Sequence, residues 1–300
     1  MPLDKHVAEL ALQLDARHQA EQAYIVRRLA RQLTPRSYGN ANEAWHAILR
    51  NIIYDGATTS PRNHITREVL ALSVTLNANH PVVTDHRRKL NYRFMAAEAA
   101  WVLRGANDLA SLEKHVKRMR DFSDDGETLA GAYGPRLRLL GSVSCGGDQL
   151  RWCAEKLAAD RDSRQAVAAI WTPTPAPSKD IPCTVDLQFL VRGYGHTKLQ
   201  TIVHMRSSDA WLGVPYDLFT FSMVAWRVAL IMRNLGVFVK PDTLTLVAGS
   251  SHLYAHDFDA ARGIIEPPYP VNAEITVPHF AGINEQDEWL ANIEQGMWNP

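Results

Sequence analysis

Residues 181–205, IPCTVDLQFLVRGYGHTKLQTIVHM, decide the fold class of this chain. Two runs rich in branched and aromatic residues, 183–191 and 197–205, flank the glycine-containing stretch RGYGH (192–196). Such runs are typical of β-strands, and a short glycine-containing stretch between them predicts a hairpin turn. An antiparallel strand pair is therefore expected in the middle of the chain.

Elements of both kinds surround this pair. Further strands are expected at 68–76, 165–172 and 243–249. Helical spacing of apolar residues predicts helices at 42–54, 86–104, 108–120, 147–159 and 216–235. The proline-rich residues 261–300 are expected to be irregular. One α+β domain with a large mixed or antiparallel sheet packed by helices fits this order best.

The N-terminal segment is expected to stand apart from that domain. Residues 5–33 have the pattern of one amphipathic helix, and LTPRSYGN (33–40) interrupts it as a linker would. We therefore divide the chain into a helical extension, 1–36, and a main domain, 37–300.

Composition limits the classes of partner. The chain has 32 basic and 32 acidic side chains, so no overall field draws a nucleic-acid polymer or a membrane surface. The N-terminus lacks the apolar run of a signal peptide, and FSMVAWRVALIM (221–232) is interrupted by Arg227 and short for a bilayer. The three cysteines have no zinc-site spacing, and His252 and His256 have no evident third ligand, so we predict no metal site. A soluble, cytoplasmic protein is expected.

Two residues stand out as candidates for chemistry. Cys183 opens a strand; a lone cysteine in an apolar run is more often a small core residue, and a zinc-deaminase site is excluded because Asp186 stands where the second cysteine would be. Glu98 is the only charged residue between Phe94 and Leu103. A carboxyl group in such a helix has a raised pKa unless it is paired, which suits proton transfer near neutral pH.

Arginines in three segments are candidates for binding an oxyanion. MRSSD (205–209) places an arginine, two hydroxyls and a carboxylate at a strand end, and SPRNHITR (60–67) and DSRQ (162–165) carry further arginines. Solvated loops have similar sequences, so spacing alone leaves both interpretations open.

Taken in order, seven segments resemble the thymidylate synthase family. The resemblance runs from about Arg50 to Arg262, and its segments are EAAWVLRGAND, AGAYGPRLR, DQL, DSRQ, IPCTVDLQFLV, MRSSDAWLGVPYD and GSSHLYAH. It implies a thymidylate-synthase-like fold, a homodimer packed sheet to sheet, a nucleoside monophosphate substrate and 5,10-methylenetetrahydrofolate as cofactor.

The resemblance assigns the reacting groups residue by residue. Cys183 corresponds to the nucleophile that adds to C6 of the pyrimidine, and Glu98 to the glutamate that organises proton transfers and water. Tyr133 corresponds to the tyrosine near the C5 proton, and Asp209 to the residue beside the base and the folate. Two residues correspond to ligands of the sugar hydroxyls, His252 and Tyr254.

The same resemblance assigns the phosphate ligands. Arg206 and Ser207 correspond to phosphate ligands of the same subunit, and Arg164 to the arginine donated by the other subunit. Arg62 is our choice for a loop arginine on the phosphate, with Arg67 as its rival because the glycines that surround this arginine in the family are absent here.

Departures from the family pattern point to a branch within it. The family's Cys-His is Cys183-Thr184, and the asparagine of its GVPFN motif is Asp217. These two departures resemble the cytidylate 5-hydroxymethylase branch, which includes phage enzymes acting on dCMP and an antibiotic-pathway enzyme acting on CMP. Gln165 in place of a second arginine and the C-terminal GMWNP also depart from the family, at the phosphate and folate contacts.

The branch implies a reaction and a basis for choosing the substrate. Cys183, with a pKa lowered by nearby arginines, is expected to add to C6, and water oriented by Glu98 to complete a hydroxymethyl group at C5. A carboxylate at Asp217 accepts from cytosine N4–H and shares a proton with N3. CMP is the expected substrate; dCMP, thymidylate synthesis with hydride, and a non-catalytic nucleotide-binding protein are the alternatives.

Overall fold

The computed structural model describes residues 37–141, 146–173, 176–267 and 272–298. The helix expected at 5–33, and with it the extension 1–36, lies outside these residues and stays a prediction.

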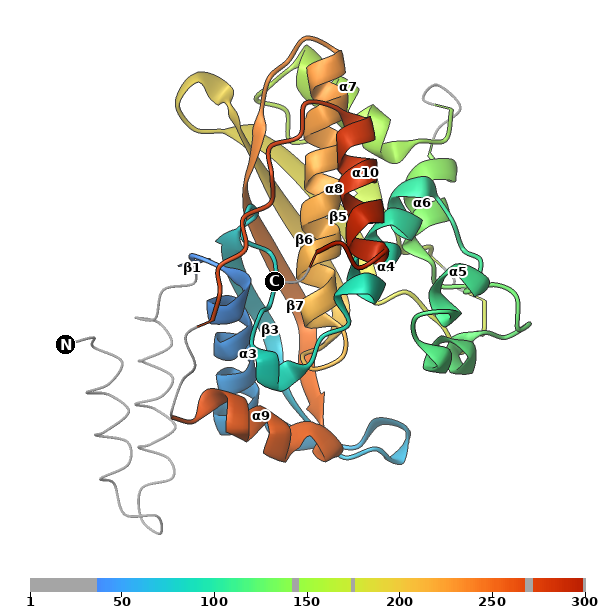
Figure 1. Ribbon diagram of the computed structural model, residues 1–300, viewed down its shortest axis with the longest axis vertical. Helices are drawn as coiled ribbons and strands as arrows, with labels where there is room; N and C mark the ends of the chain where they lie inside the picture. Colours follow the sequence, from blue (N-terminus) through green and yellow to red (C-terminus); the bar gives the residue numbers. More distant parts are fainter. Residues whose placement is uncertain (1–36, 142–145, 174–175, 268–271, 299–300) are drawn as a thin grey trace, which may run out of the picture.

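A mixed β-sheet lies at the centre of the fold (Figure 1). Its strand order is β1-β3-β7-β6-β5-β4, with β2 beside β3. The strands are β1 (Ser37–Tyr38), β2 (Ala57–Thr59), β3 (Thr66–Asn77), β4 (Val167–Ala169), β5 (Thr184–Arg192), β6 (Lys198–Asp209) and β7 (Lys240–Tyr254). β5 and β6 form the expected antiparallel hairpin, whereas β6 and β7 run parallel and are joined through a long helix. The α+β class and the large mixed sheet are confirmed.

Helices cover one face of this sheet (Figure 1). α3 packs on β3, and α8 packs on β6 and β7. The helices are α3 (Ala41–Asp55), α4 (Tyr92–Arg104), α5 (Ala110–Glu113), α6 (Tyr133–Leu139), α7 (Gln149–Ala159), α8 (Val214–Asn234), α9 (Phe258–Ile265) and α10 (Ile283–Glu294). In β5 and β6 alternate residues enter the core, while those pointing the other way stay partly exposed, among them Gln188, Leu190, Gln200, Ile202 and His204.

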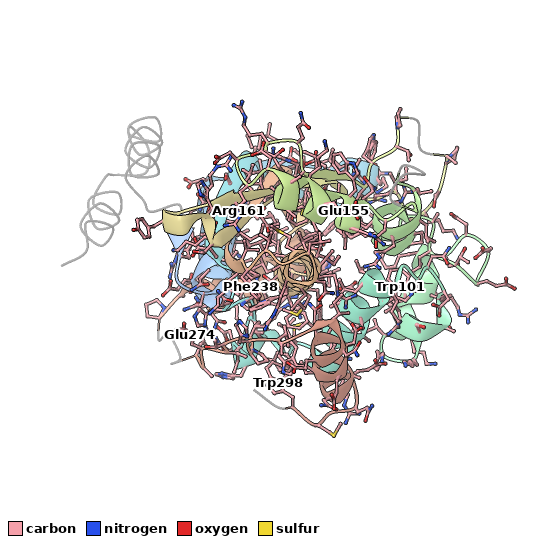
Figure 2. All side chains as sticks on the ribbon, turned by 90° about the horizontal axis from the view of Figure 1, so that it is seen from above. Trp101, Glu155, Arg161, Phe238, Glu274 and Trp298 are labelled. Atoms are coloured by element: carbon pink, nitrogen blue, oxygen red, sulfur yellow. The ribbon has the colours of Figure 1, made fainter. Side chains whose placement is uncertain are left out.

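The central helix is α8, which is seen end-on in Figure 2 with side chains packed around it. α8 extends beyond the apolar stretch 221–232 noted in the sequence. By length and composition alone it could cross a membrane, contrary to the expectation from that shorter stretch. However, 83% of its most apolar window is buried inside the fold. α8 is therefore a core helix, as in a soluble protein.

α4 carries Glu98 and is buried as its composition predicts. Its start is later than expected, because the Asn91 side chain accepts a hydrogen bond from Phe94 N and caps the helix there. Residues His86–Arg88 form a separate 3₁₀ turn before it. Gly105, in the left-handed conformation at φ 78°, ends the helix.

Three expectations about elements were wrong. The helix expected at 108–120 is interrupted because Val116 is extended (φ −140°), and only Ala110–Glu113 and the 3₁₀ segment Lys117–Phe122 form. The strand expected at 165–172 is limited to β4. The C-terminal region is not wholly irregular: α10 packs on α4 and α8, where Leu290 and Ile293 enter the core.

Candidate active site

A thiol and a guanidinium lie together at the start of β5. Cys183 is partly exposed, and Arg206 of β6 donates its backbone N–H to the Cys183 carbonyl at 2.8 Å. The Arg206 side chain donates to the carbonyls of Pro182 and Ile181, at 2.9 Å each, and its Nη2 lies 3.9 Å from Cys183 Sγ. Two backbone carbonyls thus hold a cation beside the sulfur.

Burial dominates the protonation of this thiol. It raises the pKa of Cys183, Arg206 opposes the rise, and the carboxylates of Asp217 and Asp180 add to it. Arg206 acts in the expected direction, but burial outweighs it, so the expected net lowering of the Cys183 pKa is wrong.

Three further titratable groups from three helices interact with one another, and two of them, Tyr133 and Asp217, also interact with Cys183. They are Glu98 in α4, Tyr133 at the start of α6 and Asp217 in the first turn of α8. Burial raises the pKa of Glu98 to about 7. Burial, with Glu98 and Asp209 nearby, also raises the pKa of Asp217 well above its ordinary value. Glu98 can therefore hold a proton near neutral pH, and Asp217 holds its proton more tightly than an exposed aspartate does.

Tyr133 faces the same space. Its ring stacks on Phe221 of α8, with centroids 6.0 Å apart and planes at 16°. Burial raises the pKa of Tyr133 well above its ordinary value, and Asp217 and Cys183 add to this effect. The phenol stays protonated and can donate or share a proton with a ligand.

The loop between β6 and α8 positions Asp209 and Asp217. Asp209 Oδ1 accepts from the backbone N–H groups of Trp211 (2.8 Å) and Leu212 (2.9 Å). The Gly213 carbonyl accepts from Asp217 N at 2.9 Å. A Cβ atom at Gly213 would lie only 3.1 Å from Asp217 Oδ2, so the absent side chain leaves room for this carboxyl group.

A polar row crosses the ends of β6 and β7. Ser207 Oγ lies 3.3 Å from His252 Nδ1, and His252 is the register partner of Asp209. The rings of His252 and Tyr254 meet edge to face at 5.4 Å. Arg62 Nη2 donates to the Tyr254 hydroxyl at 3.4 Å. The structure thus brings five of the candidate residues together in one row: Ser207, Asp209, His252, Tyr254 and Arg62.

Arg67 lies elsewhere. Its guanidinium donates to the Ile53 carbonyl near the end of α3 and lies over the Phe258 ring, 5.7 Å from the centroid. These contacts occupy Arg67 within the fold, whereas Arg62 extends from an exposed 3₁₀ turn to the polar row. The geometry favours Arg62 over its rival.

Arg164 is separate from this site. It is exposed in the loop between α7 and β4, where its carbonyl accepts from Gln188 Nε2 at 3.0 Å. Over the described part of the chain, its side chain has no recorded contact with Cys183 or the polar row. Within this chain, Arg164 does not reach the thiol.

Two positions near the site gave no usable signal in the sequence. Asp180 Oδ2 accepts from Gly131 N at 2.8 Å and links the loop before Tyr133 to the segment before Cys183. Arg88 donates to the Trp211 carbonyl beside Asp209. An isolated aspartate and an arginine in DHRRK look like solvated surface residues, so only their distant partners reveal them.

The carboxyl group of Asp209 bears on the cofactor of the family. Its hydrogen bonds among the described residues all use Oδ1, which leaves Oδ2 available. A pterin ring presents N–H and amino donors, and a carboxylate oxygen accepts both. The Asp209 carboxyl group therefore suits the folate cofactor that the resemblance implies.

Comparison with known proteins agrees with this geometry. The chain is 32% identical over 240 residues to the deoxyuridylate hydroxymethyltransferase of Bacillus phage SP01, a match that covers 76% of this chain and 61% of that protein. The chain thus spans about three fifths of that relative's length. The family profile described as thymidylate synthase matches residues 43–284. The chain therefore belongs to the thymidylate synthase family, whose cofactor is 5,10-methylenetetrahydrofolate.

Proposed function

We propose that this protein is a cytidylate 5-hydroxymethyltransferase that converts CMP to 5-hydroxymethyl-CMP. Methylenetetrahydrofolate, when bound, supplies the one-carbon unit that becomes attached to C5. Asp209 Oδ2 would hold its pterin ring. Water is the final nucleophile in this proposal, so no hydride is consumed.

Cys183 activates the ring carbon. C5 of a pyrimidine is a poor nucleophile, but addition of the thiolate at C6 breaks the 5,6 double bond and makes C5 electron-rich. Arg206, 3.9 Å from the sulfur, stabilises the thiolate that this step needs. The S–C6 bond breaks again once C5 carries its new substituent.

Glu98 would transfer protons to and from water and the leaving group. With a pKa of about 7, its carboxyl group exchanges protons readily near neutral pH. It can accept a proton from the water that adds to the one-carbon unit, and return one to the leaving group. Tyr133, whose phenol stays protonated, would hydrogen-bond a water that takes the proton removed from C5 and passes it to solvent, because the phenol lies close to Cys183 and Asp217.

The carboxyl group of Asp217 is the main support for cytosine as the base of the substrate. A half-buried carboxyl group with a raised pKa stands at Asp217, where the family has an amide. It can give a proton to N3 of cytosine and accept from N4–H, which forms a charge-assisted pair and makes C6 more electrophilic. Uracil N3 carries its own proton and cannot take this one, so the same ion pair does not form.

The polar row provides the remaining contacts with the nucleotide. Arg62, Arg206 and Ser207 would bind the phosphate, and His252 and Tyr254 the sugar hydroxyls. Their alignment along the ends of β6 and β7 supports one extended nucleotide site.

A homodimer with shared sites completes the proposal. The partly exposed side chains of β5 and β6 form a face that a second sheet would cover. Arg164, exposed beside this face and remote from its own thiol, would then reach the phosphate in the partner subunit. We infer a cytoplasmic enzyme with an N-terminal helical extension at 1–36.

Other substrates and reactions are explicit alternatives. The phage relative is a deoxyuridylate hydroxymethyltransferase, so dUMP competes with CMP and dCMP. Thymidylate synthesis is the more distant alternative, because Cys183-Thr184 and Asp217 both depart from the family pattern. A protein that only binds nucleotides would have no need of the thiol, Glu98 and Tyr133 together.

A tritium-release assay tests the proposal. The protein is incubated with methylenetetrahydrofolate and with CMP, dCMP, UMP or dUMP, each tritiated at C5. Release of tritium into water is measured, and the products are identified by mass spectrometry. Fastest release from CMP with a hydroxymethyl product supports the proposal, whereas a methyl product indicates thymidylate-type chemistry. Cys183→Ala is the matched control: it should stop release while the nucleotide still binds, since the covalent step contributes several kcal/mol.

A further inference from the structure

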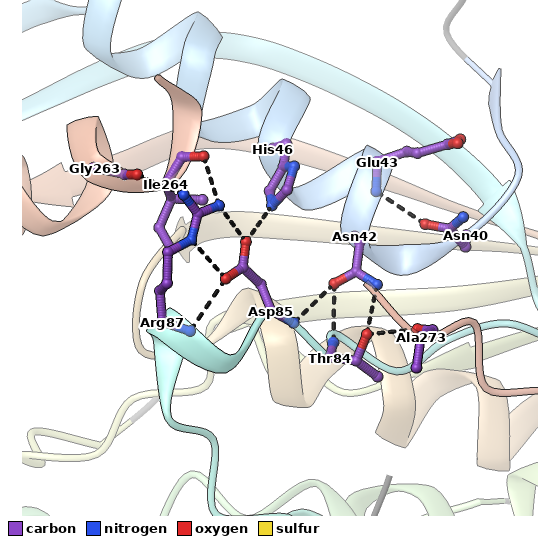
Figure 3. Close-up of polar contacts among 10 residues, drawn as sticks. All are labelled: Asn40, Asn42, Glu43, His46, Thr84, Asp85, Arg87, Gly263, Ile264 and Ala273. Carbon is purple, nitrogen blue, oxygen red and sulfur yellow. Dashed lines mark hydrogen bonds and ion pairs between the residues drawn. The ribbon is translucent and has the colours of Figure 1, made fainter. Parts of the chain in front are cut away.

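Two neighbouring arginines, Arg87 and Arg88, make contacts in different parts of the fold. Arg87 forms a fork with buried Asp85, with Nε–Oδ1 at 2.9 Å and Nη2–Oδ2 at 2.6 Å, as Figure 3 shows. His46 lies 3.1 Å from the same carboxylate, and Asn42 Oδ1 accepts from Asp85 N at 3.2 Å. This network fixes the 3₁₀ turn His86–Arg88 against α3.

Arg88 extends from this turn to the loop before α8. Its Nε and Nη2 both donate to the Trp211 carbonyl, at 3.0 Å and 2.7 Å. Its guanidinium also lies over the Trp211 ring, 4.9 Å from the centroid. The Arg88 side chain therefore contacts both the backbone carbonyl and the ring of Trp211.

Trp211 belongs to the loop that links Asp209 and Asp217, the two residues proposed to face the base. Its backbone N–H donates to Asp209 Oδ1, and two residues later Gly213 N donates to the Asp209 carbonyl at 3.0 Å. Gly213 in turn accepts from Asp217 N, at the start of α8. The loop has further ties at Ala210, whose carbonyl accepts from Trp45 Nε1 and whose N–H donates to His252. Among the described residues, only Arg88 donates a hydrogen bond to the Trp211 carbonyl.

We propose that Arg88 is a positioning residue for base selection, which it serves by holding Trp211 so that the Asp209–Asp217 loop presents the Asp217 carboxyl group to the pyrimidine. The Asp85 network would preset the direction of Arg88. The inference rests on the proposed role of Asp217 and deepens it by naming what keeps that carboxyl group in place.

A purely structural role for Arg88 makes a different prediction. Losing a stabilising contact lowers the melting temperature and weakens binding of CMP and UMP equally. Displacing the Asp217 carboxyl group weakens the binding of CMP more than the binding of UMP, because only cytosine pairs with that carboxyl group through N3 and N4–H. The ratio of the two dissociation constants separates these cases.

The test is equilibrium binding in the Cys183→Ala background, where no turnover occurs. CMP and UMP are titrated by calorimetry into this parent protein and into versions that also carry Arg88→Met or Arg88→Lys. We expect the preference for CMP to fall roughly tenfold in Arg88→Met, the order of one mispaired polar group. Arg88→Lys, which keeps a charge and one donor but not the fork, should retain an intermediate preference.

The controls make each outcome decisive. Arg151→Met removes a cation from an exposed α7 ion pair and should leave the preference unchanged. If Arg88→Met does not fold, Trp211→Phe replaces it, since this variant shrinks the ring that Arg88 covers. An unchanged preference in the variants overturns the inference, as does a parent that binds both nucleotides equally. Turnover of the wild-type protein is measured separately, so failure of the proposed reaction is distinguished from failure of this inference.

Discussion

Arg206 Nη2 lies 3.9 Å from Cys183 Sγ, and it is the group that opposes the effect of burial on the thiol. Replacing Arg206 with methionine should therefore raise the pKa of Cys183 further. The rate of iodoacetamide alkylation at pH 8 should fall about three- to tenfold, because fewer sulfurs are ionised. Arg206→Lys keeps the charge and serves as the control. Equal alkylation rates for wild type and Arg206→Met would mean that the guanidinium does not act on the sulfur.

Asp217→Asn tests base selection with a change of one atom type. The amide keeps the size of the side chain but has no proton to give to cytosine N3, and it matches the N3–H and O4 of uracil. A mispaired buried polar group costs about 1–3 kcal/mol, so the preference of kcat/KM for CMP over UMP should fall at least about tenfold. Competition kinetics with both nucleotides measures it. A preference as strong as that of the wild type would place base selection elsewhere.

Glu98→Gln tests the cost of a buried acid in the free energy of unfolding. The pKa of Glu98 is about 7 in the folded chain and near 4.5 when exposed, so the folded state binds this proton more tightly. Stability contributed by the protonated group is present at low pH and is lost as pH rises from about 4.5 to 7.

The glutamine variant lacks this loss and should be more stable than wild type above pH 7. The gain has an upper limit of about 3 kcal/mol, reduced by the partial exposure of the side chain. Urea unfolding at several pH values gives the difference, which should vanish near pH 4. The same variant should turn over substrate poorly. Parallel stability profiles for the two proteins would show that Glu98 is not strained by burial.

Hybrid dimers test whether Arg164 acts in the partner subunit. Arg164→Ala and Cys183→Ala proteins should each be nearly inactive, whereas their mixture should recover part of the activity. In a hybrid dimer one site has an intact thiol and an intact arginine. Subunit exchange is verified by native mass spectrometry of tagged chains. A monomer in sedimentation, or exchanged dimers without recovered activity, would rule out shared sites.

The sequence by itself determined the local elements and the kinds of chemical group. The alternating pattern of β5 and β6 and the apolar length of α4 depend on neighbouring residues, so both could be predicted. Motif resemblance identified Cys183, Asp217 and the polar row. Where long-range packing sets the outcome, as for α10 and the interrupted segment 108–120, local patterns were insufficient.

Tertiary structure alone decided how these groups act on one another. Burial raises the pKa of Cys183, where neighbouring arginines in the sequence had suggested the opposite. The contacts of Arg62 and Arg67 separate two arginines that look equivalent in the sequence. Arg88 finds its hydrogen-bond partner, Trp211, 123 positions away. A pKa or a hydrogen bond depends on distance and solvent exposure, and only folding brings distant segments together to set both.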